Sequence, residues 1–233
     1  MGITKHIPNT ITSMNLLSGC FATIFALQGN FKTAFVCIIA GAIFDFCDGL
    51  AARALKAYSP MGKELDSLAD MVTFGVAPAM IMFRFQAEAN FLVYLPLLIA
   101  VYSGLRLAKF NIDTRQSENF IGLATPSCAL ICGSLIYASE IYPQLAGFLT
   151  AKSYIVPMVS LVLCYLLVCE IPMFSFKFKS LKWADNSARF SFLALAAILG
   201  IATLVLGLNW SVFVFAVFTA YILVNVISAV FHK

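Results

Sequence analysis

The stretch FDFCDGLAARALKAYSPMGKELDSLAD, residues 44–70, carries four of the six aspartates of the chain, Asp45, Asp48, Asp66 and Asp70. Around it the sequence is almost continuously apolar. The 233 residues are 61% hydrophobic and 11% charged, whereas a soluble domain is about half apolar and about a quarter charged. Such a chain has too little polar surface to face water. We therefore expect an all-α integral membrane protein, because a segment in lipid must satisfy its own backbone hydrogen bonds.

Apolar runs bounded by polar or turn residues predict a polytopic bundle of about eight transmembrane helices. Each run is long enough to cross about 30 Å of hydrocarbon. The helices are expected at residues 11–29, 32–57, 62–85, 91–110, 125–142, 153–171, 188–207 and 210–231. Gly75 and Pro78 are expected to kink the third of them. No internal repeat or soluble domain is evident, so residues 1–233 are expected to form one membrane domain.

The basic residues bear on the orientation, since cytoplasmic loops of membrane proteins carry an excess of Lys and Arg. With an even number of spans and both termini in the cytoplasm, the inner side carries Lys5, Arg53, Lys56, Lys63, Arg106, Lys109, Arg115, Lys177, Lys179, Lys182, Arg189 and Lys233. The outer side keeps only Lys32, Arg84 and Lys152. The four aspartates then lie at the cytoplasmic ends of the second and third helices. The net charge of +4 is modest, and we expect membrane lipid, and no nucleic acid, around the protein.

The spacing of the aspartates places them in pairs on helix faces. Asp45 and Asp48 are three residues apart, and Asp66 and Asp70 are four apart, so each pair shares one face of its helix. Between them, residues 58–62 (YSPMG) read as the turn of an antiparallel helix pair. Folding at this turn brings the two carboxylate faces together at one membrane depth.

Four clustered carboxylates are expensive near hydrocarbon unless a counter-charge accompanies them. Oxygen ligands suit hard divalent cations, so we predict a site for two ions, Mg²⁺ or Mn²⁺, with coordination positions left for phosphate oxygens. The alternative is that the aspartates are solvated helix-end charges paired with Arg53, Lys56 and Lys63. Near the cluster, the small residues Gly49 and Ala52 let a ligand approach the backbone, and Arg53 offers a forked donor suited to phosphate.

One motif of the chain reads Asp45-x2-Asp48-Gly49-x2-Ala52-Arg53-x8-Gly62-x3-Asp66-x3-Asp70. It resembles the complete signature of the CDP-alcohol phosphotransferases. Two further stretches resemble one branch, the CDP-diacylglycerol–serine O-phosphatidyltransferases. They are HIPNTITSMNLLSG, residues 6–19, and GLRLAKFNIDTRQSENFIGLATP, residues 104–126. This chain has Lys109 where the branch more often has Arg, and Ala124 where Pro is usual. The resemblance is good from about residue 5 to residue 126.

The resemblance implies transfer of the phosphatidyl group of CDP-diacylglycerol to the hydroxyl of L-serine, giving phosphatidylserine and CMP. It also implies a homodimer in a prokaryotic inner membrane, with the active site at the cytoplasmic face. The catalytic core is expected within about residues 5–171, followed by an extra helix pair at about 188–231. Two alternatives stay open: another acceptor, glycerol phosphate or an inositol phosphate, or, in a different class, a divalent-cation transporter.

The resemblance also implies roles for single residues. Asp45, Asp48 and Asp66 would hold one ion, Asp45 or Asp66 would bridge to a second, and Asp70 would bind that second ion and act as the base. The residues expected to bind CDP-diacylglycerol are Asn9, Thr12, Gly49, Ala52, Arg53, Ser59 and Gly62, although Asn9 or Thr12 could instead cap the first helix.

Serine brings a carboxylate and an ammonium group to the site. Arg106, Lys109 and Arg115 are candidates to bind the carboxylate, and Asn111, Asp113 or Glu118 could meet the ammonium. The alternative for the basic residues is that they serve only the positive-inside topology.

Overall fold

The computed structural model describes residues 6–86, 90–113, 120–175 and 183–231, and these residues form a nearly all-α protein. The helices are α1 (Ile7–Leu27), α2 (Phe31–Ala54), α3 (Pro60–Asp70), η2 (Met71–Val76), α4 (Ala77–Phe85), η3 (Phe91–Leu97), α5 (Leu98–Ile112), α6 (Thr125–Ile141), α7 (Pro143–Thr150), α8 (Ile155–Val168), α9 (Trp183–Val205) and α10 (Trp210–Phe231). Two short strands, β1 (Phe120–Ile121) and β2 (Pro172–Met173), pair antiparallel.

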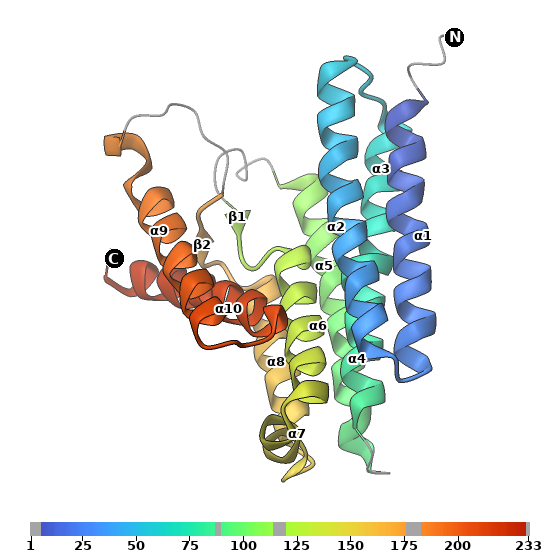
Figure 1. The fold of residues 1–233 in the computed structure, drawn as a ribbon. Coiled ribbons are helices and arrows are strands. Elements are labelled where there is room, and N and C mark those ends of the chain that lie inside the picture. The colour runs from blue at the N-terminus through green and yellow to red at the C-terminus, as the bar shows by residue number, and fades with distance from the viewer. Residues whose placement is uncertain (1–5, 87–89, 114–119, 176–182, 232–233) are drawn as a thin grey trace.

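The helices α1 to α6 and α8 form a bundle whose members run roughly side by side (Figure 1). Helix α6 lies at its centre, in contact with α2, α4 and α10, and most of its residues are buried. Helices α9 and α10 form a hairpin beside this bundle, and α10 runs across the direction of the bundle helices. The aspartate-bearing end of α2 and the start of α3 lie at the same end of the bundle as the N-terminus.

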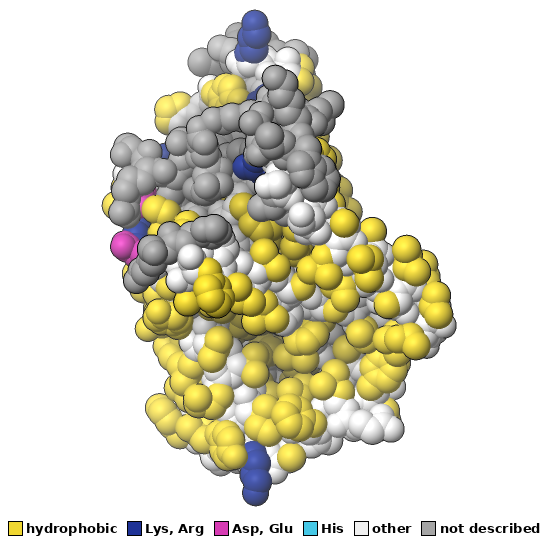
Figure 2. Space-filling model, turned by 90° about the vertical axis from the view of Figure 1, so that its left-hand side faces the viewer, with side chains coloured by type: hydrophobic (Ala, Val, Ile, Leu, Met, Phe, Trp, Pro, Cys, Tyr) yellow, Lys and Arg dark blue, Asp and Glu magenta, His cyan; other side chains and the backbone are white. Residues whose placement is uncertain are grey.

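Several helices are long and apolar enough to cross a membrane, as expected of an integral membrane protein. Five helical stretches meet this condition in the described residues, or six if the bent pair of α7 and α8 counts as one span. Figure 2 shows hydrophobic side chains over most of the middle and lower part of one face. The helical, membrane-type fold is confirmed. The count of eight spans and the cytoplasmic side of both termini stay predictions.

The helix predicted at residues 62–85 ends where expected, at Phe85, and it consists of the three consecutive segments α3, η2 and α4. It begins earlier, at Pro60, because proline needs no backbone donor at a first helical position. Ser59 caps this end, and its hydroxyl accepts a hydrogen bond from the backbone N–H of Gly62 at 2.9 Å. A π-helix, η2, follows Asp70 directly and includes Gly75. Such segments within α-helices are frequent at functional sites. The kink expected at Gly75 and Pro78 stays a prediction.

Three further features of the fold were not predicted. Helix α7 lies in the connection between the helices expected at 125–142 and 153–171, and it meets α8 at an angle of 84°. The start of the fourth helix is a 3-10 segment, η3, that contains Pro96. The strands β1 and β2 join two connections that are far apart in sequence, through the pairs Phe120–Met173 and Ile121–Pro172. A two-residue strand is too short to leave an alternating pattern in a sequence.

Candidate functional site

The turn between α2 and α3 brings together three of the four predicted metal ligands. One carboxylate oxygen from each of Asp45, Asp48 and Asp66 lies within 4.8 Å of the other two. Asp48 Oδ2 and Asp66 Oδ1 are buried and have no hydrogen-bond partner. Buried carboxylate oxygens normally have partners, and these two have the chemistry that hard divalent cations require. The three side chains therefore fit a metal ion.

The alternative of simple helix-end ion pairs finds no support here. The ion pair found between described residues joins Lys109 to Glu170, and none within 4.0 Å joins a described lysine or arginine to the four aspartates. The carboxylates therefore lack a basic counter-charge from the described residues, which is consistent with a cation completing the cluster.

Asp70 lies outside this group of three and has a partner of its own. The side-chain amide of Asn15, on α1, donates a hydrogen bond to Asp70 Oδ1 at 3.1 Å. The backbone carbonyl of Asn15 in turn accepts from Thr73 Oγ1 at 2.9 Å, so η2 is fastened to α1 beside Asp70. Asn15 was not among the site residues predicted from the sequence. The signal was available, because a polar side chain in an apolar membrane helix usually faces the bundle interior.

Two glycines allow α1, α2 and η2 to approach one another at this point. A Cβ atom at Gly19 would overlap Thr73, and one at Gly41 would lie 2.9 Å from Asn15 Oδ1. Real Cβ atoms do not occupy such positions without movement of their neighbours. The close approach of the three segments is what lets Asn15 reach Asp70 from another helix.

A pocket of about 230 Å³ opens next to the carboxylates. It is lined by Pro8, Asn9, Thr12, Asp48, Gly49, Ala52, Ala57, Tyr58, Ser59, Gly62, Lys63 and Asp66. Every residue predicted to bind CDP-diacylglycerol is in this lining except Arg53. The guanidinium of Arg53 lies close by, about 3.8 Å from where a Cβ at Gly49 would stand. Four residues of the lining, Pro8, Ala57, Tyr58 and Lys63, were not predicted from the sequence to belong to the site.

The residues of α1 in the pocket do not cap the helix. The helix begins at Ile7 after His6, so Asn9 and Thr12 lie inside it, and the capping alternative is wrong. On the facing wall, a Cβ at Gly62 would lie 3.0 Å from Asn9 Oδ1 and 3.0 Å from Ser59 Oγ. Any side chain at position 62 would therefore intrude between α1 and α3 and narrow the pocket.

The residues predicted to bind serine are more scattered. Of the four in the described part of the chain, Arg106, Lys109, Asn111 and Asp113, none lines the pocket, and Arg115 and Glu118 lie outside the described residues. Arg106 is 4% exposed, and its Nε donates to the carbonyl of Leu123 at 3.2 Å. Its terminal NH1 is buried without a hydrogen-bond partner. Arg106 therefore joins α5 to the segment before α6, and its NH1 group stays without a hydrogen-bond partner among the described residues.

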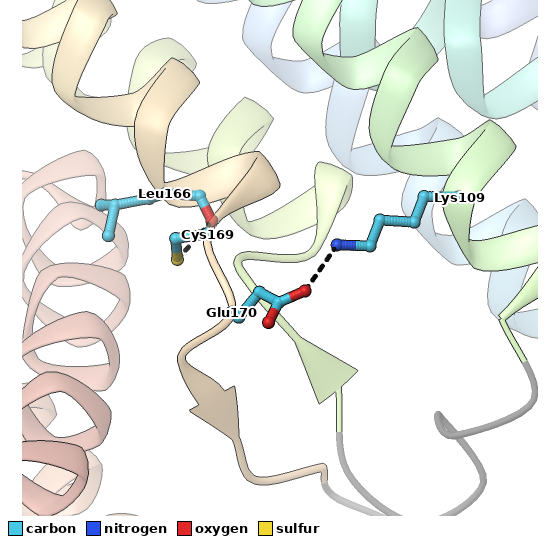
Figure 3. Close-up of polar contacts among 4 residues, drawn as sticks. All are labelled: Lys109, Leu166, Cys169 and Glu170. Carbon is cyan, nitrogen blue, oxygen red and sulfur yellow. Dashed lines mark hydrogen bonds and ion pairs between the residues drawn. The ribbon is translucent and has the colours of Figure 1, made fainter.

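Lys109 and Asn111 have partners outside the pocket. Lys109 Nζ lies 3.3 Å from Glu170 Oε1 (Figure 3). The residue before Glu170, Cys169, contacts the backbone carbonyl of Leu166 through its thiol. This ion pair joins α5 to the segment that follows α8. Asn111 Nδ2 donates to Ser67 Oγ at 2.8 Å, so this residue is attached to α3 one turn from the pocket.

The arrangement suits a ligand that carries phosphate. Carboxylates able to hold a cation stand at one side of the pocket, and small residues of α2 and α3 leave the backbone accessible beside them. A cation held there would attract phosphate oxygens, which the carboxylates alone would repel. The pocket is therefore suited to a phosphate-bearing molecule bound together with a metal ion.

Comparison with known proteins agrees with this chemistry. The family model described as CDP-alcohol phosphatidyltransferase matches residues 5–166. The CDP-diacylglycerol–serine O-phosphatidyltransferase of Bacillus subtilis is 43% identical over 126 residues, 52% of this chain and 70% of that protein. The enzyme of the same name from Helicobacter pylori strain J99 is 34% identical over 145 residues, 60% of this chain and 61% of that protein. An archaetidylserine synthase of Methanothermobacter thermautotrophicus is 29% identical over 144 residues, 60% of this chain and 61% of that protein.

Proposed function

Because the chain belongs to the CDP-alcohol phosphatidyltransferase family, we propose that it transfers the phosphatidyl group of CDP-diacylglycerol to the hydroxyl of L-serine. The family membership predicted from the aspartate motif is confirmed. One structural observation carries the proposal. Asp48 and Asp66 line the same pocket as six of the residues expected to bind the nucleotide lipid. Relatives that bear the name of this activity support serine as the acceptor.

In the proposed reaction the serine hydroxyl oxygen forms a bond to the β-phosphorus of CDP-diacylglycerol. The bond between that phosphorus and the bridging oxygen breaks, and CMP leaves with the electron pair. The hydroxyl proton passes to a carboxylate, which we assign to Asp70. Asn15 engages Oδ1 of Asp70 and leaves its second oxygen for this task.

The remaining pocket residues bind and orient. Asn9, Thr12, Gly49, Ala52, Ser59 and Gly62 form the walls against which the cytidine and diphosphate would lie, with Arg53 near the diphosphate. We propose that Asp45, Asp48, Asp66 and Asp70 hold two divalent ions, Mg²⁺ or Mn²⁺. When bound, such ions would disperse the charge of the diphosphate and stabilise the departing CMP.

The charge of the pocket favours serine over a phosphorylated acceptor. Glycerol phosphate or an inositol phosphate would bring a further dianion, which needs several basic partners. Among the described residues that line the pocket, Lys63 is the only basic one. A cation transporter is disfavoured because Asp48 and Asp66 line a pocket formed by the start of α1 and the turn between α2 and α3, and no second half of the sequence repeats the carboxylates.

The placement in the membrane belongs to the same proposal. We propose eight spans, with both termini and the aspartates at the cytoplasmic face of a prokaryotic inner membrane, in a single domain that forms a homodimer. The catalytic core is assigned to about residues 5–171, and α9 and α10 are the added helix pair. The excess of basic residues on the proposed inner side supports this orientation.

The test is to incubate the purified protein with CDP-diacylglycerol and a panel of alcohols, and to measure the release of CMP. We expect release with L-serine and much less with glycerol phosphate or inositol phosphate. Removal of divalent ions by a chelator should abolish the release, and Mg²⁺ or Mn²⁺ should restore it. Metal flux in proteoliposomes without formation of CMP would instead support the transporter.

A further inference from the structure

Lys63 lines the pocket, and its ammonium group reaches helix α5. Its neighbour Gly62 faces α1, because a Cβ there would lie 3.0 Å from Asn9 Oδ1. The ammonium of Lys63 reaches the other way, to α5, where it donates to the backbone carbonyl of Asn111 at 3.0 Å. Two adjacent residues of α3 thus line the same pocket, Gly62 on the side of α1 and Lys63 with its ammonium directed to α5.

The position of Lys63 is set by a closed series of hydrogen bonds. Its ammonium donates to the carbonyl of Asn111, and the side-chain amide of Asn111 donates to Ser67 Oγ at 2.8 Å. The hydroxyl of Ser67 donates back to the carbonyl of Lys63 at 3.3 Å. The series joins the first two turns of α3 to the last turn of α5. A long lysine side chain is flexible when free, and this contact favours one position beside the pocket.

The charge of Lys63 is available to a ligand. An ammonium group has three donors, and Asn111 takes one of them. The side chain is exposed and lies in no ion pair within 4.0 Å with a described acid. Asp66 lines the same pocket one helical turn away, but its buried Oδ1 has no hydrogen-bond partner and belongs to the proposed metal site. A ligand carboxylate next to the metal site would therefore find an unused cation.

We propose that Lys63 binds the carboxylate of the acceptor amino acid. Asn111 and Ser67 position the ammonium group of Lys63 for this contact. This inference rests on the proposed function and gives the acceptor a recognition residue at the pocket itself. A single ammonium supplies one positive charge, which balances one carboxylate but not the dianionic phosphate of a phosphorylated acceptor. It also explains how serine is held when Arg106 and Lys109 are bonded elsewhere.

The test compares Lys63→Met, which keeps the length and removes the charge, with Lys63→Arg and with the control Lys56→Met. Lys56 is exposed and outside the pocket lining. In Lys63→Met we expect the KM for serine to rise about ten- to a hundredfold, the usual effect of losing a charge-assisted hydrogen bond. The KM for CDP-diacylglycerol should change less than about threefold, because only one substrate loses a partner. Lys63→Arg should recover part of the loss, and Lys56→Met should resemble the wild type.

Serinol, which lacks the carboxylate, separates the possible outcomes. Wild type should prefer serine to serinol, and Lys63→Met should lose that preference by the same factor by which its KM for serine rises. A rise in the KM for CDP-diacylglycerol with the preference for serine intact would mean that Lys63 binds the diphosphate, and the inference would be wrong. Equal losses toward serine and serinol would likewise overturn it. If the wild type releases no CMP with serine at all, the proposed function fails first.

Discussion

The hydrogen bond between Asn15 and Asp70 offers the sharpest test of how α1 serves the site. Asn15 is fully buried, at 0% exposure, and its amide nitrogen lies 3.1 Å from Asp70 Oδ1. We consider the substitution Asn15→Ala, since the space near Gly41 is too tight for a larger side chain. The change removes the donor to Asp70, while the backbone carbonyl of residue 15 can still accept from Thr73.

The expected effect follows from the kind of bond that is lost. A hydrogen bond to a charged group is worth about 1.5–3 kcal/mol, and each 1.36 kcal/mol is about tenfold in rate. Because Asp70 loses its positioning partner, Asn15→Ala should therefore lower kcat by about ten- to a hundredfold. The KM for CDP-diacylglycerol should change only a few-fold, because the pocket lining does not include Asn15.

The assay is steady-state release of CMP at saturating metal, with Thr10→Ala as the matched control on the same helix. The hydroxyl of Thr10 is exposed and bonds only to the carbonyl of His6, so its loss should leave kcat unchanged. The double variant with Asp70→Asn is decisive. If Asn15 acts through Asp70, Asn15→Ala should cost little more once Asp70 is already an amide. An unchanged kcat in folded Asn15→Ala, or losses that simply multiply in the double variant, would refute this reasoning.

Two further predictions concern the metal site and the fold. Asp45→Ala and Asp66→Ala should each abolish release of CMP even at saturating Mg²⁺ or Mn²⁺. Their size-exclusion profiles should stay normal, because removing one anion from a repulsive cluster costs little stability. Retained turnover in either variant would exclude the proposed ligand set. Gly122→Ala should lower the thermal unfolding midpoint in detergent more than Gly207→Ala does. Both glycines have a positive φ, 77° at Gly122 and 61° at Gly207, and this conformation costs alanine about 1 kcal/mol. Of the two, Gly122 is the one where the new Cβ would also meet a backbone carbonyl, that of Cys169, at 2.8 Å. Equal shifts in the midpoint would contradict the importance of that contact.

The local geometry of the site could be predicted from the spacing of its residues in the sequence. The spacing of Asp45, Asp48 and Asp66 and the short turn that ends at Ser59 suffice to bring carboxylates of two consecutive helices together. Helical periodicity acts over three or four residues, and a tight turn fixes the pairing of the helices it joins. For the same reason most helix positions could be predicted, because the length of an apolar run reflects the thickness of the membrane.

The tertiary structure decided which distant residues meet. Asn15 and Asp70 are 55 positions apart, Lys109 pairs with Glu170, and Arg106 is buried against Leu123 instead of lining the pocket. No periodicity in the sequence announces these contacts. Helices in lipid are apolar on every side, so a hydrophobic pattern does not reveal which face turns inward. The facing is set by close packing at small residues such as Gly19 and Gly41, and this packing exists only once the helices are assembled.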